Sequence, residues 1–249
     1  MIVLKGREEI EKIRTASKYA MEMLLYLGEF IREGVKTIEL ERLCEERMRS
    51  LKVIEPAFKG YNGYPFCLCV SVNEEVIHGM PGDYVLREGD IVSLDFGAVY
   101  DGYYGDVAVT FPVGRITEEK ARLLKVTEQA LREGIEAAVE GGRLFDISYS
   151  IQSCVEGAGY SVIREFVGHG IGRELHEEPQ VPNYGKKGTG PRLKRGMVMA
   201  IEPMVSMGKS DIIIRENGWT AAVRDGSVSA HFEHTIAITD RGTEVLSQV

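Results

Sequence analysis

The sequence predicts an α+β fold in which a pair of helices precedes antiparallel strands in each half of the chain. Residues 7–33 and 37–51 carry apolar side chains at helical spacing, and a second such pair follows at 117–139 and 146–155. After each pair the pattern changes to short alternating runs bounded by glycines, which is typical of strands joined by turns. The letters themselves show no repeat, so the order of the elements alone indicates two similar halves.

Composition favours an ordinary globular protein. The 249 residues suffice for one large domain or two small ones, and the formal charge of −8 argues against a dedicated nucleic-acid surface. No apolar run is long enough for a signal peptide or a membrane span, so we expect a cytoplasmic protein. The four cysteines do not make a disulfide framework in a chain of this length, and a zinc site at Cys67 and Cys69 is disfavoured.

The first two predicted helices lead into a segment of strands and turns. Charged and apolar positions alternate at helical spacing over residues 7–33, and again over residues 37–51. Glycines and a proline interrupt residues 58–76, whose last part alternates like a strand. His78 follows directly. A lone histidine beside an apolar pair is more often structural than catalytic, and both interpretations of His78 stay open at this point.

Residues 91–111 predict a β-hairpin that turns at Asp101-Gly102, a pair with a strong preference for two-residue turns. Each arm carries one acid among apolar neighbours, and we expect the carboxylates of Asp95 and Asp106 to lie nearly opposite each other. Opposed like charges destabilise a sheet, and burying them unpaired would cost several kcal/mol each. Either a cation lies between the two carboxylates or both of them face water.

The second half repeats this order of helices and strands. A helix with acids in its first turn spans residues 117–139, and a shorter helix, capped by Asp146, spans residues 146–155. Residues 197–205 and 228–239 then read as apolar strands.

A glycine-rich stretch between these helices and strands contains two histidines. Residues 166–185 read FVGHGIGRELHEEPQVPNYG, with His169 between glycines and His176 seven residues later. The glycines miss the spacing of a dinucleotide-binding loop. We expect them instead to give the backbone special conformations around an exposed His169.

Four isolated acids and one histidine together indicate a metal centre. Asp95, Asp106, Glu202 and Glu233 lie on apolar strands where a solvated face does not explain them, and His169 adds an imidazole. Four carboxylates balance two divalent cations, and the imidazole suits Co, Mn, Fe(II) or Zn better than Ca. Two metals roughly 3.5–4 Å apart generate a hydroxide at neutral pH and stabilise a tetrahedral intermediate.

Four stretches closely resemble motifs of the type I methionine aminopeptidases, in order and spacing: LDFGAVYDGYYGDVAVTF, GHGIGRELHEEPQVPNYG, GMVMAIEPM and FEHTIAIT. The resemblance covers most of the chain. It implies a single catalytic domain over residues 1–249 with the pseudo-two-fold pita-bread fold, in which helices cover a central antiparallel sheet. It also implies hydrolytic removal of an initiator methionine that precedes a small second residue.

The resemblance further implies roles for the five candidate ligands. Asp106 and Glu233 would bridge two divalent ions, which could be Co, Mn, Fe(II) or Zn. Asp95 would bind one of these ions only, and His169 with Glu202 would bind the other. Glu202 would also be the acid/base partner of the bridging water.

Other residues match substrate contacts of the family. His78 and His176 match two histidines that contact the substrate and the scissile amide without binding metal. Where the family often has an aromatic residue before the second histidine, this chain has Leu175. The side chain of the substrate methionine would be surrounded by Tyr61, Tyr64, Cys69 and Trp219.

The resemblance implies that the substrates are deformylated amino termini of nascent polypeptides and that the protein associates transiently with the ribosome. It also implies a monomer that binds neither a membrane nor a specific nucleic acid. A prolidase or proline-specific aminopeptidase is the first alternative, because it shares the fold and the metals, although such enzymes usually carry a large extra amino-terminal domain. The second alternative is a metal-free pseudoenzyme that keeps the fold as a binding module, although all five ligands are present here.

Overall fold

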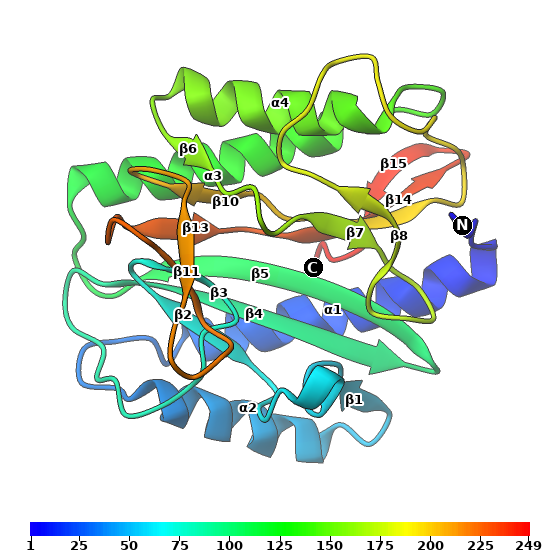
Figure 1. The fold of residues 1–249 in the computed structure, drawn as a ribbon. Coiled ribbons are helices and arrows are strands. Elements are labelled where there is room, and N and C mark those ends of the chain that lie inside the picture. Colours follow the sequence, from blue (N-terminus) through cyan, green and yellow to red (C-terminus); the bar gives the residue numbers. More distant parts are fainter.

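The computed structural model describes residues 1–249, and its helices and strands follow the predicted order (Figure 1). The helices are α1 (Arg7–Gly28), α2 (Thr37–Ser50), α3 (Glu118–Ala137) and α4 (Leu144–Gly157), with a short 3-10 turn, η1 (Tyr61–Gly63). The strands are β1 (Ile54–Pro56), β2 (Cys69–Val72), β3 (Glu75–Ile77), β4 (Ile91–Tyr100), β5 (Tyr103–Pro112), β6 (Ser161–Val162), β7 (Gly168–Gly170), β8 (Glu177–Val181), β9 (Val198–Ile201), β10 (Met204–Ser206), β11 (Ile212–Ile214), β12 (Ala221–Val223), β13 (Ser229–His231), β14 (His234–Thr239) and β15 (Gly242–Val245).

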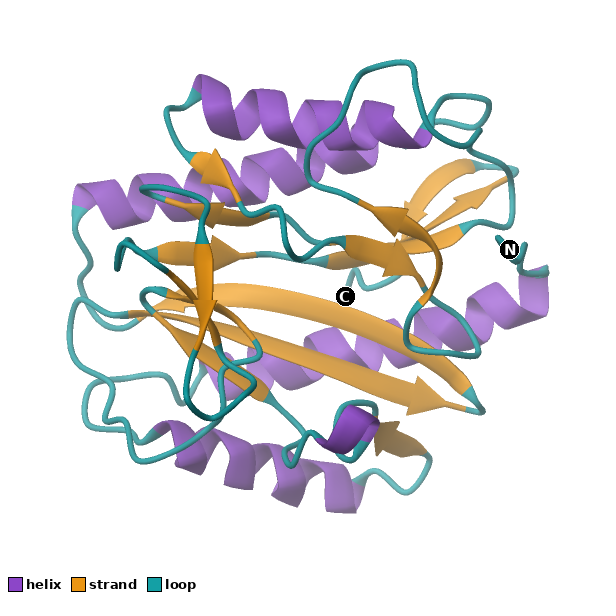
Figure 2. Cartoon of the chain, viewed as in Figure 1, coloured by secondary structure: helices purple, strands orange, loops and turns teal.

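The strands form four sheets, and every pair within them is antiparallel. The first half supplies a sheet in which β4 pairs with β5 along its whole length, and with β2 and β1 at different ends of its other edge. The largest sheet of the second half has the order β15-β14-β9-β7-β8, and the two smaller sheets are β13-β10-β6 and β11-β12-β3. Strands fill the middle of the molecule, with α1 and α2 in the lower half of the view and α3 and α4 above (Figure 2). The predicted α+β class is confirmed.

Several helix boundaries differ from the prediction, most of them by one or two residues. The first helix ends at Gly28 rather than at residue 33, and beyond it the chain continues through i→i−3 hydrogen bonds such as that from Phe30 N–H to the carbonyl of Leu27 at 3.0 Å. The last helix begins at Leu144, so Asp146 is not its cap but its third residue. The carboxylate of Asp146 accepts a hydrogen bond from the backbone N–H of Arg143 at 2.9 Å, which satisfies a free donor at the helix start.

The predicted hairpin is confirmed, with Asp101 (φ +47°) and Gly102 (φ +75°) forming the turn between β4 and β5. Two successive left-handed residues match the right-handed twist of the flanking strands. The register pairs Asp106 with Gly97 rather than with Asp95, whose partner is Ala108. The expectation of nearly opposed carboxylates was therefore wrong by two residues. The two acids remain on one face of the sheet as diagonal neighbours, since side chains two positions apart point the same way.

Both acids of the second half lie at breaks in the predicted strands. The first strand divides into β9 and β10 around Glu202 and Pro203, because proline lacks the N–H that a continuing ladder needs. The second divides into β13 and β14 at Glu233, whose N–H instead donates to Ala108 of β5 at 2.8 Å. This bridge joins the sheets of the two halves.

The buried apolar residues form one large cluster in each half, a third where the halves meet and a smaller fourth that contains Val76 and Met204. Leu24 and Phe96 represent the first cluster, which α1 and α2 cover, and Ile151 represents the second, which α3 and α4 cover. The third contains Tyr64 and Leu175. No helix here has the length and apolar character that crossing a bilayer requires. All four cysteines are free thiols.

Candidate metal centre and substrate pocket

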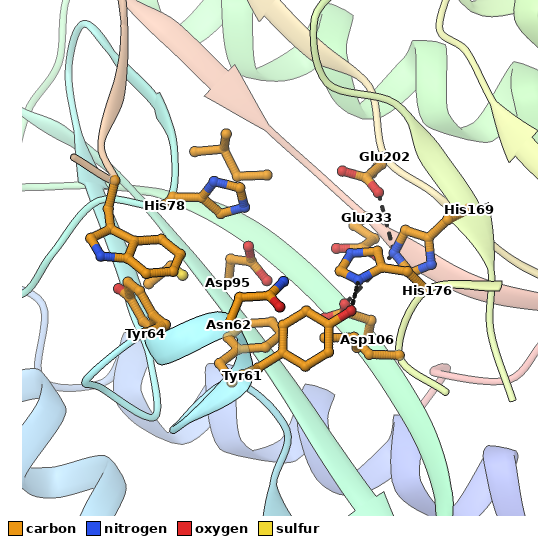
Figure 3. Close-up of a pocket in the computed structure, with 15 residues that line it drawn as sticks. Tyr61, Asn62, Tyr64, His78, Asp95, Asp106, His169, His176, Glu202 and Glu233 are labelled. Carbon is orange, nitrogen blue, oxygen red and sulfur yellow. Dashed lines mark hydrogen bonds and ion pairs between the residues drawn. The ribbon is translucent and has the colours of Figure 1, made fainter. Parts of the chain in front are cut away.

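All five predicted ligands meet at one place between the two halves (Figure 3). The first half supplies Asp95 from β4 and Asp106 from β5, and the second half supplies His169 from β7 and the two acids at the strand breaks. Each side chain is almost fully buried, with a relative exposure of 7% for Asp95, 5% for Asp106, 6% for His169, 5% for Glu202 and 2% for Glu233. Ligand atoms of Asp106, His169 and Glu233 lie within 4.8 Å of one another.

The imidazole of His169 has the tautomer that a metal ligand needs. Its Nδ1 lies 2.9 Å from the carbonyl oxygen of Gly170, and because a carbonyl only accepts, Nδ1 carries the proton. Nε2 therefore keeps its lone pair and lies 3.6 Å from Glu202 Oε1 and 3.9 Å from Asp106 Oδ2. Burial lowers the pKa of His169 to about 3, so the ring is neutral and does not neutralise the carboxylates.

The glycines around His169 have a different role from the one expected. Gly168 and Gly170 have no left-handed backbone, and His169 is buried rather than exposed. A Cβ on Gly168 would lie 2.4 Å from the carbonyl oxygen of Ala200, and one on Gly170 would lie 2.3 Å from that of Glu178. The glycines thus allow β7 to lie tightly between β9 and β8.

The four carboxylates have no cation among the side chains around them. Burial raises the pKa of Asp106 to about 7. Burial and then repulsion from neighbouring acids raise the pKa values of Asp95, Glu202 and Glu233 well above their ordinary range. Asp95 Oδ1 and Glu233 Oε1 have no hydrogen-bond partner, which is costly for buried acceptors. These unpartnered oxygens and the free Nε2 of His169 fit divalent cations bound among them.

Backbone contacts hold the ligands in place. The hydroxyl of Thr235 accepts from the N–H of Asp106 at 3.1 Å and donates to the carbonyl of the same residue at 2.8 Å. Asn183 Nδ2 donates to the carbonyl oxygen of Glu202 at 3.0 Å. Sequence reasoning missed His231, whose buried Nε2 lies 3.7 Å from Glu202 Oε2; its place two residues before Glu233 was the only available signal.

A cavity of about 150 Å³ opens beside the acids, and all six predicted substrate residues line it. The rings of Tyr64 and Trp219 meet edge to face with their centroids 5.2 Å apart, and Cys69 adds a buried thiol. Leu175 lines the wall where an aromatic residue had been expected from the resemblance. Phe58, Asn62 and Ile77 complete the lining and were not predicted from the sequence.

The two histidines predicted to contact the substrate face the cavity as neutral rings. His176 Nδ1 lies 2.9 Å from the hydroxyl of Tyr61, and the His176 ring lies 4.3 Å from that of His169. Burial lowers the pKa of His176, and it lowers the pKa of His78 to about 4. His78 also has a left-handed backbone (φ +57°), which is uncommon for a residue with a side chain and is often found at functional sites.

Removing metal is expected to make the stability of the protein fall as pH rises. The pKa of Asp106 rises from 3.8 in the unfolded chain to about 7 in the folded protein, so between these values the metal-free folded state holds an extra proton. The stabilisation that the raised pKa of Asp106 gives the folded state is complete below about pH 4 and is lost as pH rises through about 7. Thermal unfolding of chelator-treated protein from about pH 5 to pH 8 measures this loss.

The three other acids of this centre, Asp95, Glu202 and Glu233, also have raised pKa values and act in the same direction. Asp106→Asn, which removes one titrating group, should show a smaller fall. A divalent ion added near pH 8 should raise the unfolding midpoint, because it binds the folded state. An unfolding midpoint of the chelated protein that stays constant or rises over this range would contradict the assigned pKa directions.

The comparisons with known proteins agree with this geometry. Residues 11–240 match the model of metallopeptidase family M24. The chain is 51% identical to a methionine aminopeptidase of Clostridium acetobutylicum, over 99% of both chains, and 47% identical to methionine aminopeptidase 1 of Bacillus subtilis over the whole of both. The crystal structure of a methionine aminopeptidase from Thermotoga maritima superposes with a TM-score of 0.97 at 50% identity, over the whole of both chains. A prolidase from Pyrococcus furiosus gives 0.80 at 26% identity, over 99% of this chain and 66% of that one.

Proposed function

The chain belongs to metallopeptidase family M24 as a type I methionine aminopeptidase, and from that membership we propose which residues remove the initiator methionine. The observation that carries the proposal is the meeting of four buried carboxylates and one neutral imidazole beside an apolar cavity. The metallopeptidase family implies divalent metal ions, and these five side chains are the donor set that fits them.

We propose that the centre holds two divalent ions. Asp106 and Glu233 would each hold both ions, Asp95 would hold one of them, and His169 with Glu202 would hold the other. When bound, such a pair supplies Lewis acidity, which polarises the scissile carbonyl and acidifies water. Co, Mn, Fe(II) and Zn all suit four carboxylates and one imidazole.

The remaining steps belong to side chains that are already in place. Glu202 accepts a proton from the attacking water and delivers it to the departing nitrogen, which is the ordinary role of a carboxylate positioned beside the reacting groups. His78 and His176 are neutral and donate N–H groups to the scissile amide, and His176 is oriented by its contact with Tyr61.

The methionine side chain occupies the apolar end of the cavity. Tyr61, Tyr64 and Trp219 offer aromatic surfaces there and Cys69 offers a thiol, a lining that suits a flexible and polarizable thioether. The free amino group of the substrate then lies among the acids. Crowding near His78 and His176 favours a small second residue.

A panel of short peptides tests this assignment. Met-Ala should be cleaved faster than Leu-Ala by about 10- to 200-fold, since an apolar pocket distinguishes small differences in side-chain size only to that extent. Met-Lys should react more slowly than Met-Ala because of its larger second residue, and formyl-Met-Ala, whose amino group is blocked, is the negative control. The measurement is kcat/KM for each peptide with the metal-loaded protein.

The same panel separates the prolidase alternative. The prolidase structure shares the fold at 26% identity, whereas methionine aminopeptidases match at 47–51% over nearly the whole chain. An Xaa-Pro peptide should therefore be a poor substrate. Cleavage of Xaa-Pro faster than that of Met-Ala would assign the chain to the prolidase-like activity instead.

We further propose that residues 1–249 act as a single catalytic domain and as a monomer in the cytoplasm. The substrates are deformylated nascent chains, met through transient contact with the ribosome. The division of one site between both halves supports a single domain, because neither half holds the complete ligand set.

A further inference from the structure

The loop that carries His176 has two sides with different surroundings. It joins β7 to β8, and its inner side places Leu175 and His176 against the cavity. Its outer side meets the chain before α1, where Lys5 lies. Nothing in the metal centre or the methionine pocket involves Lys5, although its side chain is only 3% exposed. A lysine is almost never fully buried unless it is paired, so Lys5 should have an acidic partner.

The partner of Lys5 is Glu177, the residue directly after His176. Lys5 Nζ forms an ion pair with Glu177 Oε2, and the glutamate side chain is 12% exposed. Lys5 Nζ also donates to the carbonyl of Val3 at 3.1 Å. The backbone of Lys5 is itself anchored, since its N–H donates to the carbonyl of Gly196 at 2.7 Å. The cation is therefore held at a fixed place on the body of the protein.

Glu177 connects the anchored Lys5 side chain to the loop. Its second oxygen, Oε1, accepts the backbone N–H groups of Arg173 at 2.8 Å and Glu174 at 3.3 Å. One carboxylate thus connects Lys5 to both ends of the segment that contains His176. Release of that carboxylate would free two loop N–H groups at once.

The fit between Lys5 and the loop is close. A Cβ on Gly172 would lie 2.4 Å from Lys5 Cε and 2.6 Å from Glu177 Oε1, so the lysine stem packs directly on the glycine backbone. Gly172 in turn accepts a hydrogen bond from the N–H of Tyr104 on β5 at 2.8 Å. Because Lys5 packs directly on the outer side of the loop, a substitution of Lys5 should alter the position of the loop.

We propose that Lys5 is a positioning residue for methionine removal, acting through Glu177 to hold His176 at the scissile amide. The inference rests on the role proposed above for His176. Without the cation, the mostly buried carboxylate of Glu177 would lack its ion pair beside two further acids, Glu174 and Glu178. Such a carboxylate turns towards water, and the loop then loses its two hydrogen bonds.

The test is a double-mutant cycle. Lys5→Met keeps most of the apolar stem and removes the charge, and it should lower kcat by roughly 10- to 100-fold, since a misplacement of about 1 Å can cost this much. KM should change less than kcat. In a His176→Ala background the same substitution should change kcat by less than about twofold, because the group that Lys5 positions is already absent.

Control variants and a hydrogen-exchange measurement distinguish a positioning role of Lys5 from a general loss of stability. Arg14→Met removes another partly buried ion pair, with Glu244, and should leave kcat at the wild-type value. Glu177→Gln keeps an oxygen for the two loop N–H groups and should retain more activity than Glu177→Ala. Hydrogen exchange of the Arg173 and Glu174 amides should accelerate in Lys5→Met while the amides of β9 stay protected.

The possible outcomes are distinct. A loss in Lys5→Met that is equally large in the His176→Ala background would overturn the positioning role, and so would an unchanged kcat in Lys5→Met. Full activity of His176→Ala would overturn the role proposed for His176, and the inference with it. Faster exchange in the loop together with a loss that depends on His176 is the expected result.

Discussion

Replacing Asp106 or Glu233 by alanine is expected to abolish methionine removal and to lower the bound metal below two ions per chain. Both carboxylates are proposed to bridge the ions, so either change leaves both ions short of a ligand. It also leaves three buried carboxylates around a weakened site. The measurements are metal content by atomic spectroscopy and cleavage of Met-Ala after chelation and titration with a divalent ion.

The control for this prediction lies on the same hairpin. Asp101 forms the turn, and asparagine tolerates its left-handed backbone, so Asp101→Asn should keep both activity and metal content. Full activity of Asp106→Ala or Glu233→Ala across the whole metal titration would end the two-ion interpretation. Loss of activity with two tightly bound ions would instead show that these acids act on the substrate.

Replacing His78 or His176 by alanine is expected to lower kcat by about 10²- to 10⁴-fold while both metal ions stay bound, the range for a positioned acid–base or hydrogen-bonding group. Both rings line the cavity, and neither places a ring nitrogen within 4.0 Å of a carboxylate of the metal centre. His169, whose Nε2 lies 3.6 Å from Glu202 and 3.9 Å from Asp106, provides the comparison: His169→Ala should lower the metal affinity. Titration calorimetry with a divalent ion and steady-state kinetics on Met-Ala separate the two effects.

Tyr61→Phe adds a smaller, directed change. It removes the hydroxyl that contacts His176 Nδ1 and leaves the aromatic wall. We expect a weaker loss of kcat than in His176→Ala and little change in preference for methionine. If His78→Ala or His176→Ala released metal in parallel with activity, the assignment of that histidine as a substrate contact would be wrong.

Local sequence patterns predicted the fold well at positions where few residue types can adopt the required backbone conformation. Asp101-Gly102 placed the hairpin turn, because few other pairs accept two left-handed residues in succession. The expected register was nevertheless wrong by two residues, although a two-residue turn at Asp101-Gly102 pairs Tyr100 with Tyr103 and therefore Asp95 with Ala108. The end of α1 was missed because the apolar spacing continues to Ile31, past the point where the helical hydrogen-bond pattern changes.

The five candidate ligands could be selected from the sequence because charge on an apolar strand is rare enough to be noticed, and the structure brings them together. The contacts around them were not predictable from pattern. The glycines beside His169 serve close packing against Ala200 and Glu178, and no local signal distinguishes that use from a left-handed backbone. His231 and Lys5 escaped for the same reason, because their partners, Glu202 and Glu177, come from distant parts of the chain.

The division of the ligands between the two halves sets an order of events during synthesis. Asp95 and Asp106 leave the ribosome first, as two like charges on one hairpin face with no second set of ligands beside them. Glu233, whose N–H bridges to that hairpin at Ala108, emerges later. The proposed ligand set is therefore incomplete in a growing chain, and we expect metal capture only once the later strands have docked on the earlier ones.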